Sequence, residues 1–216
     1  MSPRTLRLCV KISSIVLVLA VGCAPPPPSA SETGQPTEPS FSEQIAAVRA
    51  LESDKIELLY TPVAVDELSQ LDGLTHLKLL RLDAAPITDN ALAPILSLQN
   101  LEILNVPRAQ FTDGAVEQFT ALPHLRILRF GSPNVTDAAL AHVPQMPALR
   151  TLILEDSPIT DAALQHLYGL KDLESFYVSG TKITSDGLAE LQEALPGLHI
   201  HDNGRHLPGD QHDHKH

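Results

Sequence analysis

The sequence predicts an α/β fold: a right-handed solenoid with a parallel sheet on its concave side and short helices on its convex side. The prediction rests on apolar series that repeat every 24 residues. The first series comprises Ile56, Leu80, Leu104, Leu128, Leu152, Phe176 and Ile200. The second lies two residues later and comprises Leu58, Leu82, Val106, Phe130, Leu154 and Val178. A spacing of two puts both side chains on one face of a strand, so each repeat contains one strand.

A short helix is predicted after each strand. A third apolar series comprises Val63, Ile87, Phe111, Val135, Ile159 and Ile183. Most copies continue with Thr-Asp and then with apolar residues spaced by three or four, as at Leu164, Leu167 and Leu170, which is the period of a helix. The Thr caps free backbone N–H groups and the Asp favours the positive helix end, so both have a structural role. Pro94 falls inside one such helix and predicts that it is short or distorted.

One repeat cannot bury its apolar face alone, so the repeats must stack and the two ends need caps. Ser40 and Glu43 match a capping box that starts an N-terminal cap helix over residues 41–53, with Leu51 on its apolar face. The repeats span about residues 56–202. The predicted domain is therefore 41–202, followed by a His-rich disordered tail over 203–216.

The repeats resemble those of a known family. Residues 101–106 (LEILNV) and 149–154 (LRTLIL) match the LxxLxL strand pattern of leucine-rich-repeat proteins, and 159–164 (ITDAAL) is similar to their bacterial form. The resemblance covers residues 56–200 and implies a concave sheet that binds protein. It departs at the usual Asn position after the strand, which here holds Ala85, Ala109, Pro133, Ser157 and Thr181. The Asn hydrogen-bond ladder of many family members is therefore not expected.

The N-terminus has the layout of a signal peptide over residues 1–22. Arg4, Arg7 and Lys11 precede an apolar run that is too short to span a bilayer, which needs about 20 residues. The run ends at residues 19–23 (LAVGC), which resembles a bacterial lipobox and makes Cys23 the lipid-attachment site. Ordinary cleavage after residue 24 is the alternative, although Pro25 would then adjoin the cut bond.

Residues 23–40 are expected to form a disordered, Pro-rich tether, because they contain no large apolar side chain. The chain is then exported and lipid-anchored to a bacterial membrane, on its periplasmic or cell-surface side. Formal net charge is -11, and removal of residues 1–22 changes it to 12 minus 26, or -14. This negative field excludes nucleic acid as a general partner.

The predicted concave face contains the candidate site. Its partner-binding residues, taken from the strands and their starts, are Arg81, Asn105, Arg126, Arg129, Arg150, Ile153 and Tyr177. Two of these arginines, 126 and 150, occupy one repeat position and should lie side by side, which is unfavourable unless their charge is neutralised. Two interpretations follow. Either Glu102, Glu155 and Glu174 neutralise the arginines, or an acidic patch on a protein partner does, beside apolar anchors at residues 153 and 177.

The C-terminal tail is rich in a metal-binding residue type. Candidate ligands of a divalent transition metal are His206, His212, His214 and His216. Their spacing matches no defined zinc signature, and a solvated polar tail is the simpler explanation.

Binding, not catalysis, is the predicted activity. The sequence contains no GxSxG, HExxH or nucleotide-binding motif, and the two cysteines, Cys9 and Cys23, both lie in the N-terminal segment. We expect a membrane-tethered protein-binding scaffold without a cofactor. The alternative is a metal-binding lipoprotein that acts through its tail.

Mass spectrometry of membrane-purified protein tests the lipid anchor. We expect a mature chain that begins at acylated Cys23, and we expect Cys23→Ser to leave the precursor unprocessed, because acylation requires the thiol. An unmodified N-terminus at any other residue contradicts the prediction.

Overall fold

The computed structural model describes residues 38–203 and 205–206. The expected signal peptide, Cys23, most of the tether and His212, His214 and His216 lie outside these residues. Within the described part of the chain, no helix has the length and apolar character needed to cross a membrane.

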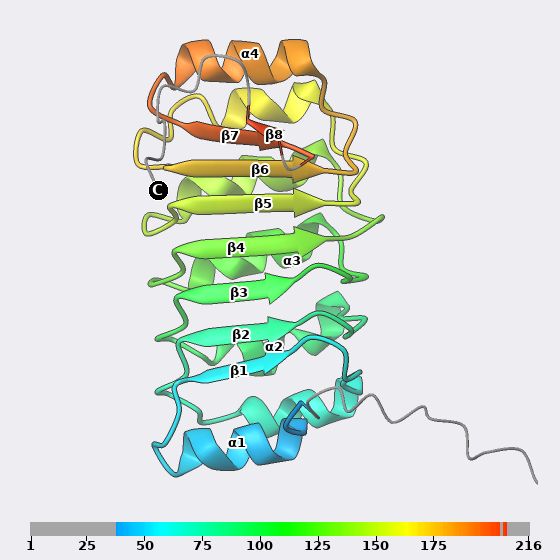
Figure 1. The fold of residues 1–216 in the computed structure, drawn as a ribbon, viewed down its shortest axis with the longest axis vertical. Helices are drawn as coiled ribbons and strands as arrows, with labels where there is room; N and C mark the ends of the chain where they lie inside the picture. The colour runs from blue at the N-terminus through cyan, green and yellow to red at the C-terminus, as the bar shows by residue number, and fades with distance from the viewer. Residues whose placement is uncertain (1–37, 204, 207–216) are drawn as a thin grey trace, which may run out of the picture. The chain divides into compact units, whose positions relative to one another are not determined.

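The repeat domain is built on one sheet whose strands follow the order of the chain (Figure 1). The strands are β1 (Lys55–Leu58), β2 (Leu79–Leu82), β3 (Ile103–Val106), β4 (Ile127–Gly131), β5 (Thr151–Glu155), β6 (Ser175–Ser179), β7 (His199–Asp202) and β8 (Arg205–His206). The first seven are parallel. Ile56 pairs with Leu80 and Leu128 with Leu152, so residues 24 apart in sequence are neighbours across the sheet. The predicted fold class is confirmed.

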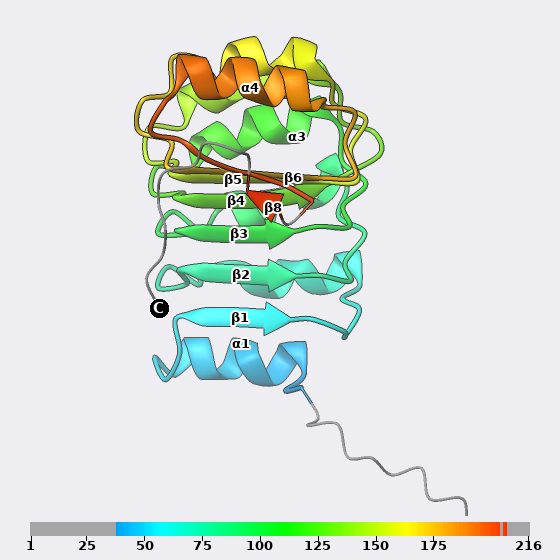
Figure 2. The same cartoon turned by 45° about the horizontal axis from the view of Figure 1, so that its top comes forward.

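The core lies between the sheet and the helical segments on its other side (Figure 2). Both strand series are buried, and Ile56, Leu80, Leu104, Leu128 and Leu152 have no exposed surface. Three aromatic rings fill the middle of the stack: Phe111 contacts Phe119 edge-on at 5.6 Å between ring centroids and Phe130 at 5.7 Å. Apart from these rings, the core is mostly aliphatic and is packed in repeated layers.

The convex segments are helical, but several are 3-10 rather than α-helical. They are η1 (Val65–Leu71), η2 (Asp89–Ala91), α2 (Ala93–Leu96), α3 (Asp113–Gln118), η3 (Phe119–Ala121), η4 (Asp137–Gln145), η5 (Asp161–His166) and α4 (Ser185–Ala194). An α-helix is about 10 Å wide, whereas strands lie only about 4.8 Å apart. The slimmer 3-10 helix reduces this mismatch between the two sides of each repeat. Pro94 lies at the start of α2, which has four residues, as its position predicts.

Successive repeats are joined on the convex side by an aspartate–threonine ladder. Each Asp that begins a helical segment accepts two hydrogen bonds from the Thr of the next repeat, one from its backbone N–H and one from its hydroxyl. The pairs are Asp89–Thr112, Asp113–Thr136, Asp137–Thr160 and Asp161–Thr184, with donor–acceptor distances of 2.6 to 2.8 Å. The same Thr hydroxyl accepts from the N–H of its own helical segment, for example from Ala162 at 3.3 Å. The four threonines that bind an Asp of the preceding repeat therefore also cap their own helical segments, whereas Thr88 makes no side-chain cap.

The N-terminal cap is α1 (Phe41–Arg49), and the predicted capping box of Ser40 and Glu43 is confirmed. The expected extension of this helix to residue 53 is wrong. Leu51 has a positive φ of 60° and is 67% exposed, because the chain must turn there to enter β1. Gln44 covers the free edge of β1: its Nε2 donates to the Glu57 carbonyl at 2.8 Å and its Oε1 accepts from the Glu57 N–H at 2.7 Å.

The C-terminal end of the sheet differs from the expectation that disorder begins at residue 203. Strand β8 pairs antiparallel with β7, with His201 opposite His206 and Asp202 opposite Arg205. Asn203 joins them with a φ of 46°. Asn-Gly is a strong hairpin signal, and residues 203–204 carry it, so this return strand was readable from the sequence. It covers part of the free edge of β7, which would otherwise expose unpaired backbone groups.

Gly131 lies where backbone atoms of neighbouring repeats come close together, and its substitution tests this close approach. A Cβ at this position would collide with the Pro107 carbonyl oxygen and lie 2.6 Å from that of Glu155, both of which are backbone atoms. We expect Gly131→Ala to lower the free energy of unfolding by about 2 kcal/mol or more, because overpacking forces the backbone to shift. Gly169→Ala is the control, since nothing lies within 4 Å of a Cβ there. Equal denaturant midpoints for the two variants would contradict the close approach.

Substitution of Asp137 tests whether the aspartate–threonine ladder stabilises the stack of repeats. Asp137→Ala removes two hydrogen bonds to Thr160, and we expect a loss of about 1 to 2 kcal/mol in urea unfolding. Asp172→Ala, which changes an exposed acid outside the ladder, should alter stability by less than about 0.5 kcal/mol. If both variants unfold at the wild-type midpoint, the ladder does not stabilise the stack.

Candidate functional site

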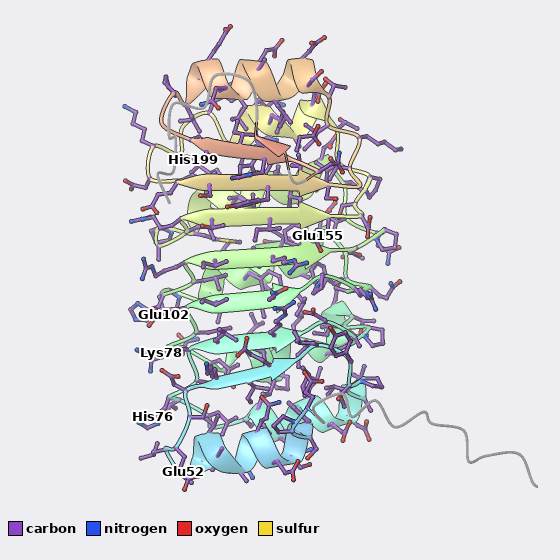
Figure 3. The ribbon with its side chains drawn as sticks, viewed as in Figure 1. Glu52, His76, Lys78, Glu102, Glu155 and His199 are labelled. Atoms are coloured by element: carbon purple, nitrogen blue, oxygen red, sulfur yellow. The ribbon has the colours of Figure 1, made fainter. Side chains whose placement is uncertain are left out.

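The concave face of the sheet presents two rows of side chains, which the parallel register fixes. The start row comprises Lys55, Leu79, Ile103, Ile127, Thr151, Ser175 and His199. The end row, two residues later on each strand, comprises Glu57, Arg81, Asn105, Arg129, Ile153, Tyr177 and His201. All are half-buried except Lys55, which is exposed. Figure 3 shows the side chains that project from this face.

Apolar side chains cross this face diagonally. In the start row they lie on β2, β3 and β4, and in the end row they lie on β5 and β6. We call this set the apolar band: Leu79, Ile103, Ile127, Ile153 and Tyr177. The band changes rows between Ile127 and Ile153, whose Cα atoms are about 8 Å apart for ordinary strand spacing and rise. The band is thus continuous over five strands.

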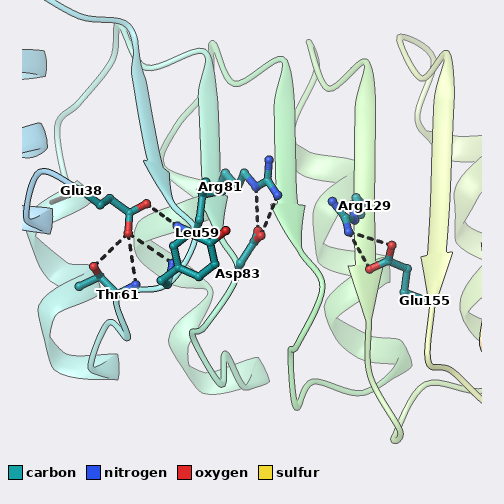
Figure 4. Close-up of polar contacts among 8 residues, drawn as sticks. Glu38, Leu59, Thr61, Arg81, Asp83, Arg129 and Glu155 are labelled. Carbon is teal, nitrogen blue, oxygen red and sulfur yellow. Dashed lines mark hydrogen bonds and ion pairs between the residues drawn. The ribbon is translucent and has the colours of Figure 1, made fainter. Parts of the chain in front are cut away.

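Two ion pairs border the band in the end row (Figure 4). Arg81 donates to both carboxylate oxygens of Asp83, at 2.9 and 2.7 Å. Arg129 donates from Nη2 to both oxygens of Glu155, at 2.8 and 3.0 Å. The hydrogen bond to Asp83 raises the pKa of Arg81 above its ordinary value, against a smaller opposing effect of burial. Both arginines are therefore held in place by acids of the same chain.

The two adjacent arginines at the strand starts are also paired. Arg126 lies 4.0 Å from Glu102, and Arg150 lies 3.8 Å from Glu174. Lys78 shares Glu102 at 3.4 Å. Each of these pairs has at least one highly exposed member, so each contributes little to stability. Together with the Arg129–Glu155 pair, they match the interpretation in which the glutamates neutralise the arginines.

A hollow of about 320 Å³ opens at the C-terminal end of the band. Tyr177 and His201 form one wall and stack with ring centroids 4.2 Å apart and an interplanar angle of 8°. Arg129, Ile153 and Glu155 form another part of the lining. His201 was absent from the sequence-based set, although it lies 24 residues after Tyr177 and so continues the same row.

Two polar atoms on this face have no hydrogen-bond partner in the described part of the chain. They are the buried Asn105 Oδ1 and Arg129 Nε, whose residues pair across β3 and β4. An unpaired acceptor and an unpaired donor therefore lie on neighbouring strands.

The structure thus brings together most of the predicted partner-binding residues. Arg81, Asn105, Arg129, Ile153 and Tyr177 share the end row, whereas Arg126 and Arg150 lie at the strand starts beside it. Of the proposed metal ligands, His206 lies in β8, and the other three fall outside the described residues. Within residues 38–203, no three or more His, Cys, Asp or Glu side chains are grouped so as to hold a metal ion.

Comparison with known proteins identifies the fold. No protein-family model matches the sequence, and no curated protein matches it. An internalin from Listeria monocytogenes superimposes with a TM-score of 0.50 and 21% sequence identity, over 68% of this chain and 39% of that one. Internalin C2 from the same organism gives a TM-score of 0.46 and 20% identity, over 72% of this chain and 83% of that one. Internalins are leucine-rich-repeat proteins, and this chain has the leucine-rich-repeat solenoid fold, although it spans well under half of the first internalin.

Proposed function

We propose that this chain is a membrane-tethered scaffold that binds a partner protein through its concave face, without catalysing a reaction. The apolar band is the observation that carries the proposal. Its five large side chains stay partly exposed on a regular sheet, where burial by a partner would release about 25 cal/mol per Å² of apolar surface. The adjoining arginines, asparagine and tyrosine are the polar and aromatic types that protein interfaces use around an apolar centre.

The internal ion pairs on the concave face indicate which side chains would supply affinity and which would supply specificity. Arg81 and Arg129 already have carboxylate partners, so a partner protein does not need an acidic patch to balance them. We assign the binding energy to the apolar band and assign specificity to the ordered ion pairs along its border. A partner that presents misplaced charge there would separate a pair that the sheet holds in position, which disfavours wrong partners.

The tether belongs to the same proposal. A lipid on Cys23 would anchor the chain in a bacterial membrane on its periplasmic or cell-surface side, and the Pro-rich segment would hold the solenoid away from the bilayer. A single lipid chain binds a membrane only reversibly, whereas the several acyl chains of a bacterial lipoprotein bind it stably. The net charge of the processed chain, 12 minus 26 or -14, disfavours nucleic acid as a partner.

Photo-crosslinking in cells that produce the full chain tests the concave face. A photoreactive residue replacing Ile153, in the apolar band, should yield a discrete adduct with a partner. The same residue replacing Gln165, which is exposed on η5, should not. Adducts of equal yield from both faces would contradict concave binding.

Tyr177 provides the matching affinity test on the partner so identified. We expect Tyr177→Ala to weaken binding by about 2 kcal/mol, because the aromatic anchor of the band is lost. That is roughly thirtyfold in Kd. Tyr168→Ala removes the same side chain from a turn after η5 and should leave Kd unchanged. Equal effects of the two substitutions in calorimetry would remove the band as the contact area.

A further inference from the structure

One carboxylate in the N-terminal segment makes contacts that neither the repeat pattern nor the proposed function explains. Glu38, two residues before the cap of α1, accepts four hydrogen bonds from the loop that follows β1 (Figure 4). The donors are the Leu59 N–H at 2.5 Å, the Tyr60 and Thr61 N–H groups at 3.3 Å each, and the Thr61 hydroxyl at 3.0 Å. The donors and the acceptor are separated by at least 21 residues of chain.

The geometry of this contact is that of an anion-binding site. Three consecutive backbone N–H groups converge on one carboxylate, as they do in the concave backbone nests that bind anions. Hydrogen bonds to an ionised acceptor are about twice as strong as those between neutral groups. Burial acts to raise the pKa of Glu38, but the hydrogen bonds from Leu59, Tyr60 and Thr61 together hold the pKa below its ordinary value. The cradle therefore favours the charged carboxylate.

Other side chains at this end of the domain have separate tasks. Glu43 closes the capping box with Ser40, and Gln44 covers the edge of β1 by bonding Glu57. Glu38 contributes to neither contact, and its carboxylate binds the loop that follows the C-terminal end of β1. Its bonds thus hold the segment that leads into α1 on the domain, in a region that the sequence assigns to a disordered tether.

We propose that residues 59–61 form a carboxylate-binding cradle whose built-in ligand is Glu38. This contact, which we call the strap, holds the N-terminal segment against the loop at the carboxyl end of β1. The strap also positions Tyr60, the most exposed large hydrophobic residue of the described chain at 84%. Tyr60 lines a hollow of about 330 Å³ along this edge, together with Asp83, Pro107 and Arg108. The strap thus fixes the point at which the N-terminal segment joins the domain. It also fixes the backbone of Tyr60, and with it the position of this exposed side chain. This inference goes beyond the proposed function and does not depend on a partner.

Amide hydrogen exchange on the full chain, read by NMR, tests the strap. We expect Glu38→Ala to speed exchange at the residue 59, 60 and 61 amides by roughly tenfold or more, because their acceptor is lost. Glu38→Gln keeps one carbonyl acceptor without the charge and should have an intermediate effect. Glu52→Ala changes an exposed acid near the end of α1 and should leave these three amides at wild-type rates. Amides of β4 and β5 serve as an internal measure that the stack is intact.

A pH titration separates the strap from a general loosening of the loop. In the wild type, the amide shifts of residues 59–61 should follow one ionisation with a midpoint below about 4.3, the ordinary value for a glutamate. This transition should be absent in Glu38→Ala and Glu38→Gln. Exchange rates at residues 59–61 that are equal in the wild type and Glu38→Ala, or an ordinary glutamate midpoint, would overturn the proposal.

Discussion

Each repeat leaves one apolar face that only its neighbour can cover, and the rest of the structure follows from this dependence. In the sheet, the parallel register covers the apolar face of each repeat, because it places Leu80, Leu104 and Leu128 side by side and fully buried. On the convex side, hydrogen bonds hold neighbouring repeats together. The Asp of one repeat binds the Thr of the next by two hydrogen bonds, so neighbouring repeats are aligned at both faces of the core. A substitution in one repeat therefore acts mainly on the two repeats beside it.

The same dependence explains the ends. A stack of strands exposes unpaired backbone groups at its first and last members, which invites association with other chains. At the start, Gln44 supplies a donor and an acceptor to β1 in the way a neighbouring strand would, and α1 covers the core. At the other end, β8 folds back on β7. Both ends thus satisfy unpaired backbone groups of an edge strand, one with a glutamine side chain and the other with a returning strand.

The proposed binding surface is a consequence of this architecture. Because alternate side chains of each strand face the core, the remaining ones form two ordered rows whose composition is free to vary. In this chain the rows combine a diagonal apolar band with internally paired arginines, such as Arg129 with Glu155. Since the strands fix the spacing of these side chains, the proposed partner would meet a preorganised surface, and binding would cost little ordering entropy.

The sequence by itself determined the repeat, the strands and their faces, because burial every second residue and every 24 residues leaves a periodic pattern that needs no coordinates. It therefore placed Arg81, Asn105, Arg129, Ile153 and Tyr177 on one surface. It did not reveal that Asp137 binds Thr160, that the convex segments are largely 3-10, or that the rings of Tyr177 and His201 stack. Those features depend on how one repeat approaches the next. The Glu38 contact was equally hidden, because only the folded chain brings a carboxylate onto amide groups 21 or more residues away.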